Sequence, residues 1–283
     1  MSGTLYLVST PIGNLEDITL RALRILREEV TAIACEDTRQ TQKLLEHFEI
    51  RKPLISYHEH NETSRAAEIV ERLAAGDSIA IVTDAGTPLI SDPGYRVVSA
   101  AIEAGITVVP LPGASALLTA LAASGLPVDQ FRFIGFLPPK THARKEVFAS
   151  LKADPGTVIV YESPHRILES LSDLAEILGE RQVVLGRELT KLHEEFLRGT
   201  ASEIRAVLAA RASIKGEMTL VIGRSPEQIM EGDPKDNVAA LEQQGINRME
   251  AIKAVAKQMG LPKREVYRLM TDGPPAKGTK VRR

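Results

Sequence analysis

Apolar and polar positions alternate along the first 110 residues in a pattern of short buried strands and amphipathic helices. Residues 18–30 and 62–76 place Leu, Ile and Ala at helical spacing, and Gly76 is typical of a helix end. A strand followed by a helix, repeated in this way, predicts a mainly parallel sheet with helices on both faces. Five apolar runs bounded by turn residues are the predicted strands: 4–9, 31–35, 54–57, 78–83 and 106–110.

A second series begins near Phe131 and predicts a second α/β unit. Between the two series, residues 112–127 are expected to form a helix of small residues that lies at the seam. Gly113 and Ser115 at its start leave backbone donors where a ligand can approach. The predicted strands of the second unit are 131–136, 157–162, 182–188, 194–199 and 217–223, and its predicted helices are 141–152, 164–178 and 201–210.

The C-terminal part of the chain has a different character. Three short helices are predicted over 237–245, 248–260 and 262–270, and the turn around Gly260 and Pro262 gives the last two a spacing that resembles a helix-turn-helix. Residues 273–283 are typical of a disordered basic tail. We therefore predict four parts: an α/β domain over 1–112, a second α/β domain over 113–224, a polar linker over 225–235, and a basic helical module with its tail over 236–283.

Composition and charge narrow the class of protein. With 283 residues, 43% hydrophobic and 25% charged, the chain is typical of a folded soluble protein. It shows neither a membrane-spanning apolar stretch nor a secretory signal, so we expect a cytoplasmic protein with no membrane contact. Cys35 is the single cysteine, which excludes an intrachain disulfide, and the HEH at 58–60 lacks the partners of a zinc motif, so no metal is expected.

Charge is distributed unevenly along the chain. Residues 1–234 contain 24 Lys and Arg against 32 Asp and Glu, whereas residues 235–283 contain 11 against 5. A basic segment attracts the phosphates of nucleic acids. We therefore expect a nucleic-acid contact at this basic end.

The loop DAGTPLISDPG, residues 84–94, directly follows an apolar strand and indicates a ligand site. Its glycines permit positive φ, its prolines stiffen the backbone, and Thr87 and Ser91 add hydroxyl groups. Open α/β sheets bind ligands in loops at the carboxyl ends of their strands. The G-x-G-x-x-G fingerprint of dinucleotide sites is absent, and Pro11 and Gly13 form a rigid turn after the first strand instead.

Eight motifs in a fixed order identify a family. The chain resembles the ribosomal-RNA-modifying members of the tetrapyrrole methylase superfamily over essentially its whole length. The resemblance implies two α/β domains that hold a bent S-adenosylmethionine in the cleft between them. It also implies a homodimer that methylates the ribose 2′-hydroxyl of a cytidine in the decoding region of 16S rRNA. The motifs are VSTPIGNLEDITLRA, CEDTRQTQKLL, SYHEHNE, VTDAGTPLISDPG, PGASALLTALAASG, FIGFLPPK, YESPHR and GRELTKLHEE.

The same resemblance implies which residues bind the cofactor. The superfamily's Gly-Asp-Pro loop matches the segment around Gly86, where Thr87 replaces the acidic residue, so mainly backbone contacts are expected there. The PGASA turn matches a second cofactor segment, and residues from the second domain are expected to close the site. The full expected set is Pro11, Asp84, Gly86, Thr87, Pro88, Ile90, Ser115, Ala116, Tyr161 and Met218.

A ribose hydroxyl is a poor nucleophile at neutral pH, so a nearby base would help the implied transfer. Glu36 and Asp37 are adjacent carboxylates after a strand, although Asp37 suits a helix cap equally well. Glu162 and His165 cluster at a strand-to-helix junction, where a structural or RNA-contacting role is the alternative for His165. These four residues are the candidates for the base.

Basic residues in five segments of the chain are candidates for phosphate contacts, with a solvated face or an internal salt-bridge network as the alternative. They are Arg39, Arg144, Lys145, Arg166, Lys191, Lys263, Arg264 and Arg268.

Two other functions fit part of the sequence. A tetrapyrrole methylase that acts on a porphyrinoid shares the implied fold and cofactor, but it needs no phosphate-binding module. A non-enzymatic nucleic-acid-binding regulator would use the C-terminal helices, but it leaves the ligand-type α/β architecture unexplained.

Overall fold

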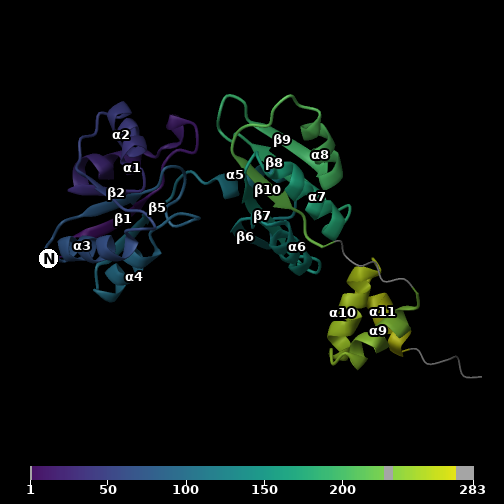
Figure 1. Cartoon of the computed structure of the whole chain (residues 1–283). Coiled ribbons are helices and arrows are strands. Elements are labelled where there is room, and N and C mark those ends of the chain that lie inside the picture. Colours follow the sequence, from purple (N-terminus) through teal and green to yellow (C-terminus); the bar gives the residue numbers. More distant parts are fainter. Residues whose placement is uncertain (1, 226–231, 272–283) are drawn as a thin grey trace, which may run out of the picture. The chain divides into compact units, whose positions relative to one another are not determined.

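We describe residues 2–225 and 232–271 of a computed structural model of the chain. The chain forms two compact units, Met1–Ser225 and Pro226–Arg283, and the first contains two separate β-sheets (Figure 1). None of the described helices is both long and apolar enough to cross a bilayer.

The first sheet contains five parallel strands in the order β3-β2-β4-β1-β5. This arrangement confirms the predicted parallel sheet. Its strands are β1 (Thr4–Val8), β2 (Ala32–Cys35), β3 (Leu54–Ser56), β4 (Ile79–Val82) and β5 (Thr107–Leu111), and its helices are α1 (Leu20–Arg24), α2 (Thr38–His47), α3 (Glu62–Ala74) and α4 (Tyr95–Glu103).

Helices cover both faces of this sheet, as predicted. On one face Leu73 of α3 and Val97 of α4 pack against alternate strand residues such as Leu5. On the other face Leu26 and Leu45, from the α1 and α2 regions, pack against residues such as Val8. Because every residue of β2 and β4 is buried, these strands read as continuous apolar runs in the sequence.

The helix predicted over 18–30 differs in detail from the structure. It begins at Leu20, because the Thr19 side chain accepts a hydrogen bond from the Ala22 N–H at 3.0 Å and so caps the helix. After Arg24 the chain continues as a π-helical turn over Ile25–Glu29.

The second sheet has the order β6-β7-β10-β8-β9 and is mixed, because only β6 and β7 run parallel. Strand β10, the last of the five in the chain, lies between β7 and β8 and is antiparallel to both. The strands are β6 (Phe131–Phe136), β7 (Thr157–Glu162), β8 (Gln182–Arg187), β9 (Glu195–Thr200) and β10 (Met218–Ile222).

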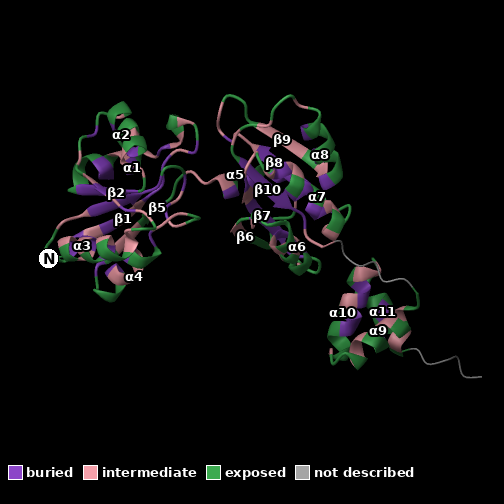
Figure 2. Cartoon of the chain, in the orientation of Figure 1, coloured by how far each residue is buried: buried purple, intermediate pink, exposed green. Residues whose placement is uncertain are grey.

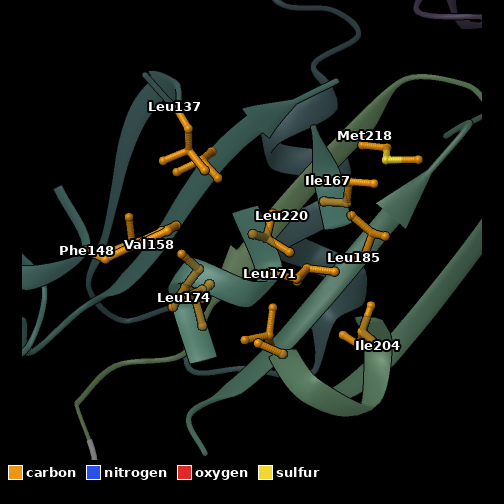
Figure 3. Packing of buried hydrophobic residues seen from close by; sticks show 14 of the residues in the cluster. Leu137, Phe148, Val158, Ile167, Leu171, Leu174, Leu185, Ile204, Met218 and Leu220 are labelled. Atoms are coloured by element: carbon orange, nitrogen blue, oxygen red, sulfur yellow. The ribbon is translucent and has the colours of Figure 1, made fainter. Parts of the chain in front are cut away.

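Two hydrophobic clusters cover the faces of the second sheet. On one face Phe148, Leu171 and Ile204 come from α6 (Thr141–Ser150), α7 (Ile167–Leu178) and α8 (Ala201–Ala209) and pack against the strands (Figure 3). On the other face α5 (Ala116–Ser124) packs its small apolar residues against β7, β8 and β10. Ile12, from the loop after β1, belongs to this second cluster, so the first half of the unit contributes to it.

The helix predicted from Pro164 begins at Ile167. Ser163 to Arg166 form a turn instead, in which the Ser163 carbonyl accepts hydrogen bonds from the N–H groups of Arg166 and Ile167. His165 therefore precedes α7.

The C-terminal unit contains α9 (Pro234–Gln243), α10 (Arg248–Gln258) and α11 (Lys263–Thr271). Val238, Ile252 and Val266 belong to a buried cluster formed only by this unit (Figure 2). Helix α9 starts at Pro234, inside the predicted linker, because the Asp233 side chain caps it. The rest of the predicted linker over 226–231, and the predicted disordered tail over 273–283, lie outside the described residues.

Candidate active site

A cleft of about 660 Å³ lies in the first unit, lined by loops that follow strands of both sheets. Ile12 follows β1, the 84–94 loop follows β4, and Ser115 and Ala116 begin α5. The second sheet contributes the end of β7, the loop after β8 and the start of β10. The sequence-predicted residues that line the cleft are Asp84, Gly86, Thr87, Ile90, Ser115, Ala116, Tyr161, Glu162, Lys191 and Met218.

Hydrogen bonds fix the 84–94 loop to its neighbours. The Thr87 hydroxyl donates to the Ala114 carbonyl at 3.2 Å, and the Ser9 hydroxyl donates to Thr87 at 3.3 Å. A side chain at Gly113 would collide with Ser9, because a Cβ built there lies 2.5 Å from the Ser9 Cβ. The loops after β1, β4 and β5 are therefore packed closely enough to form one rigid wall of the cleft. Pro11 and Pro88, also expected at the cofactor, do not line the cleft themselves.

Asp92 is a cleft residue that the sequence analysis did not single out. Burial raises its pKa to about 6, and the nearby carboxylates of Glu36 and Asp84 add to the shift, although the Thr83 hydroxyl opposes it. No cation forms an ion pair with Asp92 among the described residues. Its only signal in the sequence was its place in the Gly- and Pro-rich loop.

Asp37 lies at the start of α2, outside the lining of the cleft. Its carboxylate accepts a hydrogen bond from the Arg39 N–H at 2.8 Å and forms an ion pair with the Arg39 guanidinium. The Arg39 side chain is the largest cause that lowers the pKa of Asp37 to about 2. This geometry agrees with the helix-cap alternative for Asp37. Glu36 does not line the cleft either.

Glu162 lines the cleft from the end of β7 and is 2% exposed. One carboxylate oxygen accepts from the Ser163 N–H at 2.7 Å and from Arg166 at 2.9 Å, and the other accepts from the Ser170 hydroxyl at 2.6 Å. Both carboxylate oxygens are occupied by these partners, so Glu162 positions the turn before α7. His165 in that turn is exposed and does not line the cleft.

Lys191 lies inside a network of ion pairs at the cleft. Its ammonium group is 2.9 Å from Glu188 and 3.1 Å from Glu217. Its stem packs on Gly13, where a Cβ would lie 2.3 Å from the Lys191 Cγ. Lys191 therefore fits the alternative of an internal salt-bridge network. Through its contact with Gly13 it also joins the two halves of the first unit at the cleft.

The burial of Arg144 contradicts its predicted contact with phosphate. Its side chain is 0% exposed and donates to Asp173 at 2.7 Å. A buried and paired guanidinium has no surface to offer to RNA. The neighbouring Lys145 remains at the surface, where it pairs with Glu176 at 2.7 Å.

The remaining predicted RNA contacts lie apart from the cleft lining. Arg39 is exposed on α2, and Arg166 is held by the buried Glu162. On the C-terminal unit, Lys263, Arg264 and Arg268 are exposed on α11.

Comparison with known proteins identifies the class. The described fold resembles solved methyltransferases, among them uroporphyrin-III-C-methyltransferase from Thermus thermophilus, with a TM-score of 0.54 and 21% identity over 78% of this chain and 94% of that one. It also resembles a diphthine synthase, with a TM-score of 0.58 and 12% identity over 94% of this chain and 100% of that one. These likenesses show the fold alone.

Sequence comparison gives the family. The model of the family Tetrapyrrole (Corrin/Porphyrin) Methylases matches residues 4–205, and the chain belongs to this family of methyltransferases. The chain is 50% identical over 275 residues to a protein of Halalkalibacterium halodurans named "Ribosomal RNA small subunit methyltransferase I", with 94% of each covered. It is 49% identical over 273 residues to the protein of the same name from Bacillus subtilis, covering 94% of this chain and 93% of that one.

Proposed function

We propose that this methyltransferase transfers a methyl group from S-adenosylmethionine to the RNA of the small ribosomal subunit. The observation that supports this substrate is the identity of 50% over 94% of the chain to a relative with that printed name. The family resemblance narrows the acceptor to the 2′-hydroxyl of a cytidine in the decoding region of 16S rRNA. When bound, S-adenosylmethionine supplies an electrophilic methyl group.

The composition of the cleft fits this cofactor. Ile12, Ile90 and Met218 offer apolar surfaces that suit an adenine ring, and the carboxylate of Asp84 suits a positively charged amine or sulfonium. A related uroporphyrin-III C-methyltransferase was solved with S-adenyl homocysteine. The proposed cofactor residues are Asp84, Gly86, Thr87, Ile90, Ser115, Ala116, Tyr161 and Met218, with Pro11 and Pro88 supporting their loops.

We propose that Asp92 is the general base that accepts the proton of the ribose hydroxyl. It lines the cleft and is free of ion pairs among the described residues, whereas Glu162 is committed to Ser163, Arg166 and Ser170. A carboxylate with a pKa of about 6 is mostly ionised at neutral pH and is a stronger base than an ordinary aspartate. Asp92→Asn keeps the shape of the side chain and removes this proton acceptor, so kcat should fall by about 10²-fold or more while cofactor affinity changes little.

The proposal extends to the assembly and to the roles of the domains. Residues 1–112 and 113–224 are the two halves that hold the cofactor, and the C-terminal unit, whose first helix begins at Pro234, is an RNA-binding module. The enzyme acts in the cytoplasm as a homodimer, a state that the family resemblance supports.

Labelled S-adenosylmethionine tests the function directly. Small ribosomal subunits from a strain without this gene are incubated with the enzyme, and the modified nucleoside is identified by mass spectrometry. The proposal predicts 2′-O-methylcytidine, and Asp92→Asn serves as the inactive control. Cofactor binding by calorimetry without any label in the RNA would contradict the substrate and favour a porphyrinoid acceptor.

A further inference from the structure

A second cavity, of about 390 Å³, adjoins the cleft. Glu188 lines both cavities, and Lys215 in the second is followed directly by Gly216 in the first. We call this second cavity the basic pocket. Its lining residues are Arg187, Glu188, His193, Arg211, Ser213, Ile214 and Lys215.

Glu195 on β9 fixes the two arginines of the basic pocket. The Arg187 Nε donates to Glu195 at 2.9 Å, and the two terminal nitrogens of Arg211 donate to the same carboxylate at 2.8 and 2.6 Å. Arg211 is the largest cause that lowers the pKa of Glu195 to about 2, so this anion persists at all working pH values. Two guanidinium groups share one carboxylate, and a positive charge therefore remains in a fixed geometry.

Donors in the basic pocket remain available to a ligand. The Arg187 Nη1 bonds the Lys215 carbonyl at 3.2 Å, whereas its Nη2 and the Arg211 Nε have no hydrogen-bond partner within residues 2–225 and 232–271. The Lys215 ammonium is exposed and forms no ion pair with any described residue, unlike Lys145 and Lys191 of the same half.

Carboxylates do not cancel this charge. Glu188, the one acidic residue in the lining, is paired with Lys191 at 2.9 Å. His193 on the rim is exposed and adds a further donor. Because Glu195 neutralises one of the two guanidinium charges, the basic pocket presents about two net positive charges, from the arginine pair and Lys215, together with a histidine, to any anion that enters it.

We infer that the basic pocket binds a phosphodiester of the RNA backbone next to the nucleotide that enters the cleft. This inference rests on the proposed function. The ligand is an anion, because fixed guanidinium groups with free N–H groups bind phosphate oxygens. The anion belongs to the same strand, because the two cavities share Glu188 and meet at the Lys215–Gly216 peptide, so the phosphates that flank a nucleotide in the cleft are the nearest anions to the basic pocket.

Charge reversal at Lys215 tests the inference in the full chain. Lys215→Glu reverses a surface side chain that pairs with none of the described residues, so the fold should be unaffected. The matched control is Lys152→Glu, since Lys152 is also exposed, forms no ion pair among the described residues and lines neither cavity. Methylation of undermodified small subunits is measured as a function of subunit and salt concentration, and cofactor affinity is measured by calorimetry.

Lys215→Glu should raise the KM for the RNA substrate by about tenfold and make the dependence of log(kcat/KM) on log salt shallower by about one. Both kcat and cofactor affinity should stay within twofold, and Lys152→Glu should match wild type in every measurement. An unchanged KM and salt slope would overturn the inference, as would a parallel loss of cofactor affinity. If the wild-type enzyme itself leaves the RNA unmethylated, the proposed function fails instead.

Discussion

Thr10 and Gly86 are joined by a reciprocal pair of backbone hydrogen bonds, with N–H to carbonyl distances of 2.9 and 3.0 Å. This isolated antiparallel bridge ties the loop after β1 to the loop after β4. The Gly86 N–H and carbonyl are therefore committed to Thr10, so the cofactor that we propose for this cleft would contact the Cα surface of Gly86 and not its backbone polar groups. The need for glycine comes from its φ of +89° and from the short distance to Ile12.

A side chain at Gly86 should block the cofactor. In Gly86→Val the branched side chain extends from a strained backbone into the cleft, so calorimetry should show S-adenosylmethionine affinity reduced by at least about tenfold. Gly105→Val is the matched control, because Gly105 has a φ of +69° and nothing lies within 4 Å of a Cβ built there. Equal losses of affinity in both variants would mean that backbone strain, and not the cleft, causes the effect.

The raised pKa of Asp92 predicts how the stability of the fold depends on pH. The folded-state pKa is about 6, against about 3.9 for an unfolded aspartate. Between these values the folded state binds more protons, so the free energy of unfolding falls as pH rises through this window. Asp92→Asn should therefore be more stable than wild type above pH 6, by about 1–2 kcal/mol because solvent screens part of the effect at this partly exposed side chain, and lose this advantage near pH 4.

Asp37→Asn provides a control of opposite sign. The pKa of Asp37 is lowered to about 2, so its ion pair with Arg39 stabilises the fold above the unfolded pKa and is lost as pH falls toward 2. Urea unfolding at pH 3 and pH 7.5 measures both variants, because pH 3 lies inside the window for Asp37 and below the window for Asp92. The same pH trend for the two variants would contradict the assignment.

The first sheet was predictable because its signal is local. Each strand of the parallel sheet is a short apolar run, and the turn residues that bound it are adjacent in the sequence. The direction of β10 was not predictable in this way. Its residues are all buried between β7 and β8, and a fully buried strand has the same apolar pattern whether its neighbours run parallel or antiparallel.

In the candidate site, too, features with a local sequence signal were predictable and features that depend on distant residues were not. The signal for the 84–94 loop is its own run of glycines and prolines, so the sequence alone indicates a ligand site there. The raised pKa of Asp92 depends first on its burial in the fold and also on carboxylates such as Glu36, and the burial of Arg144 depends on Asp173, which is 29 residues away. Side chains that meet through the fold leave no periodic or local signal.

The Arg144–Asp173 pair should support the fold and leave RNA binding unaffected. Arg144→Met leaves the largely buried Asp173 without its main cation, which should cost about 3–5 kcal/mol of unfolding free energy in urea. The double variant Arg144→Met, Asp173→Leu should recover most of that loss, because it leaves no buried charge. The KM for RNA is measured at a temperature where Arg144→Met is folded. If Arg144→Met raises this KM but does not lower the free energy of unfolding, Arg144 contacts an RNA phosphate after all.

Removing the C-terminal unit should weaken RNA binding and spare the cofactor. The clusters that pack the two sheets contain no residue beyond Ile222, and the C-terminal cluster contains only its own residues, so a chain ending at Ser225 should still fold. Its affinity for S-adenosylmethionine should equal that of the full chain, whereas its RNA affinity should fall and depend less steeply on salt. The full-length variant Lys263→Glu, Arg264→Glu reverses two exposed charges of α11 without touching the buried Val266, and it should show the same loss in milder form. If both proteins bind RNA with wild-type affinity and salt dependence, the first unit alone anchors the RNA, and the basic end of the chain has another role.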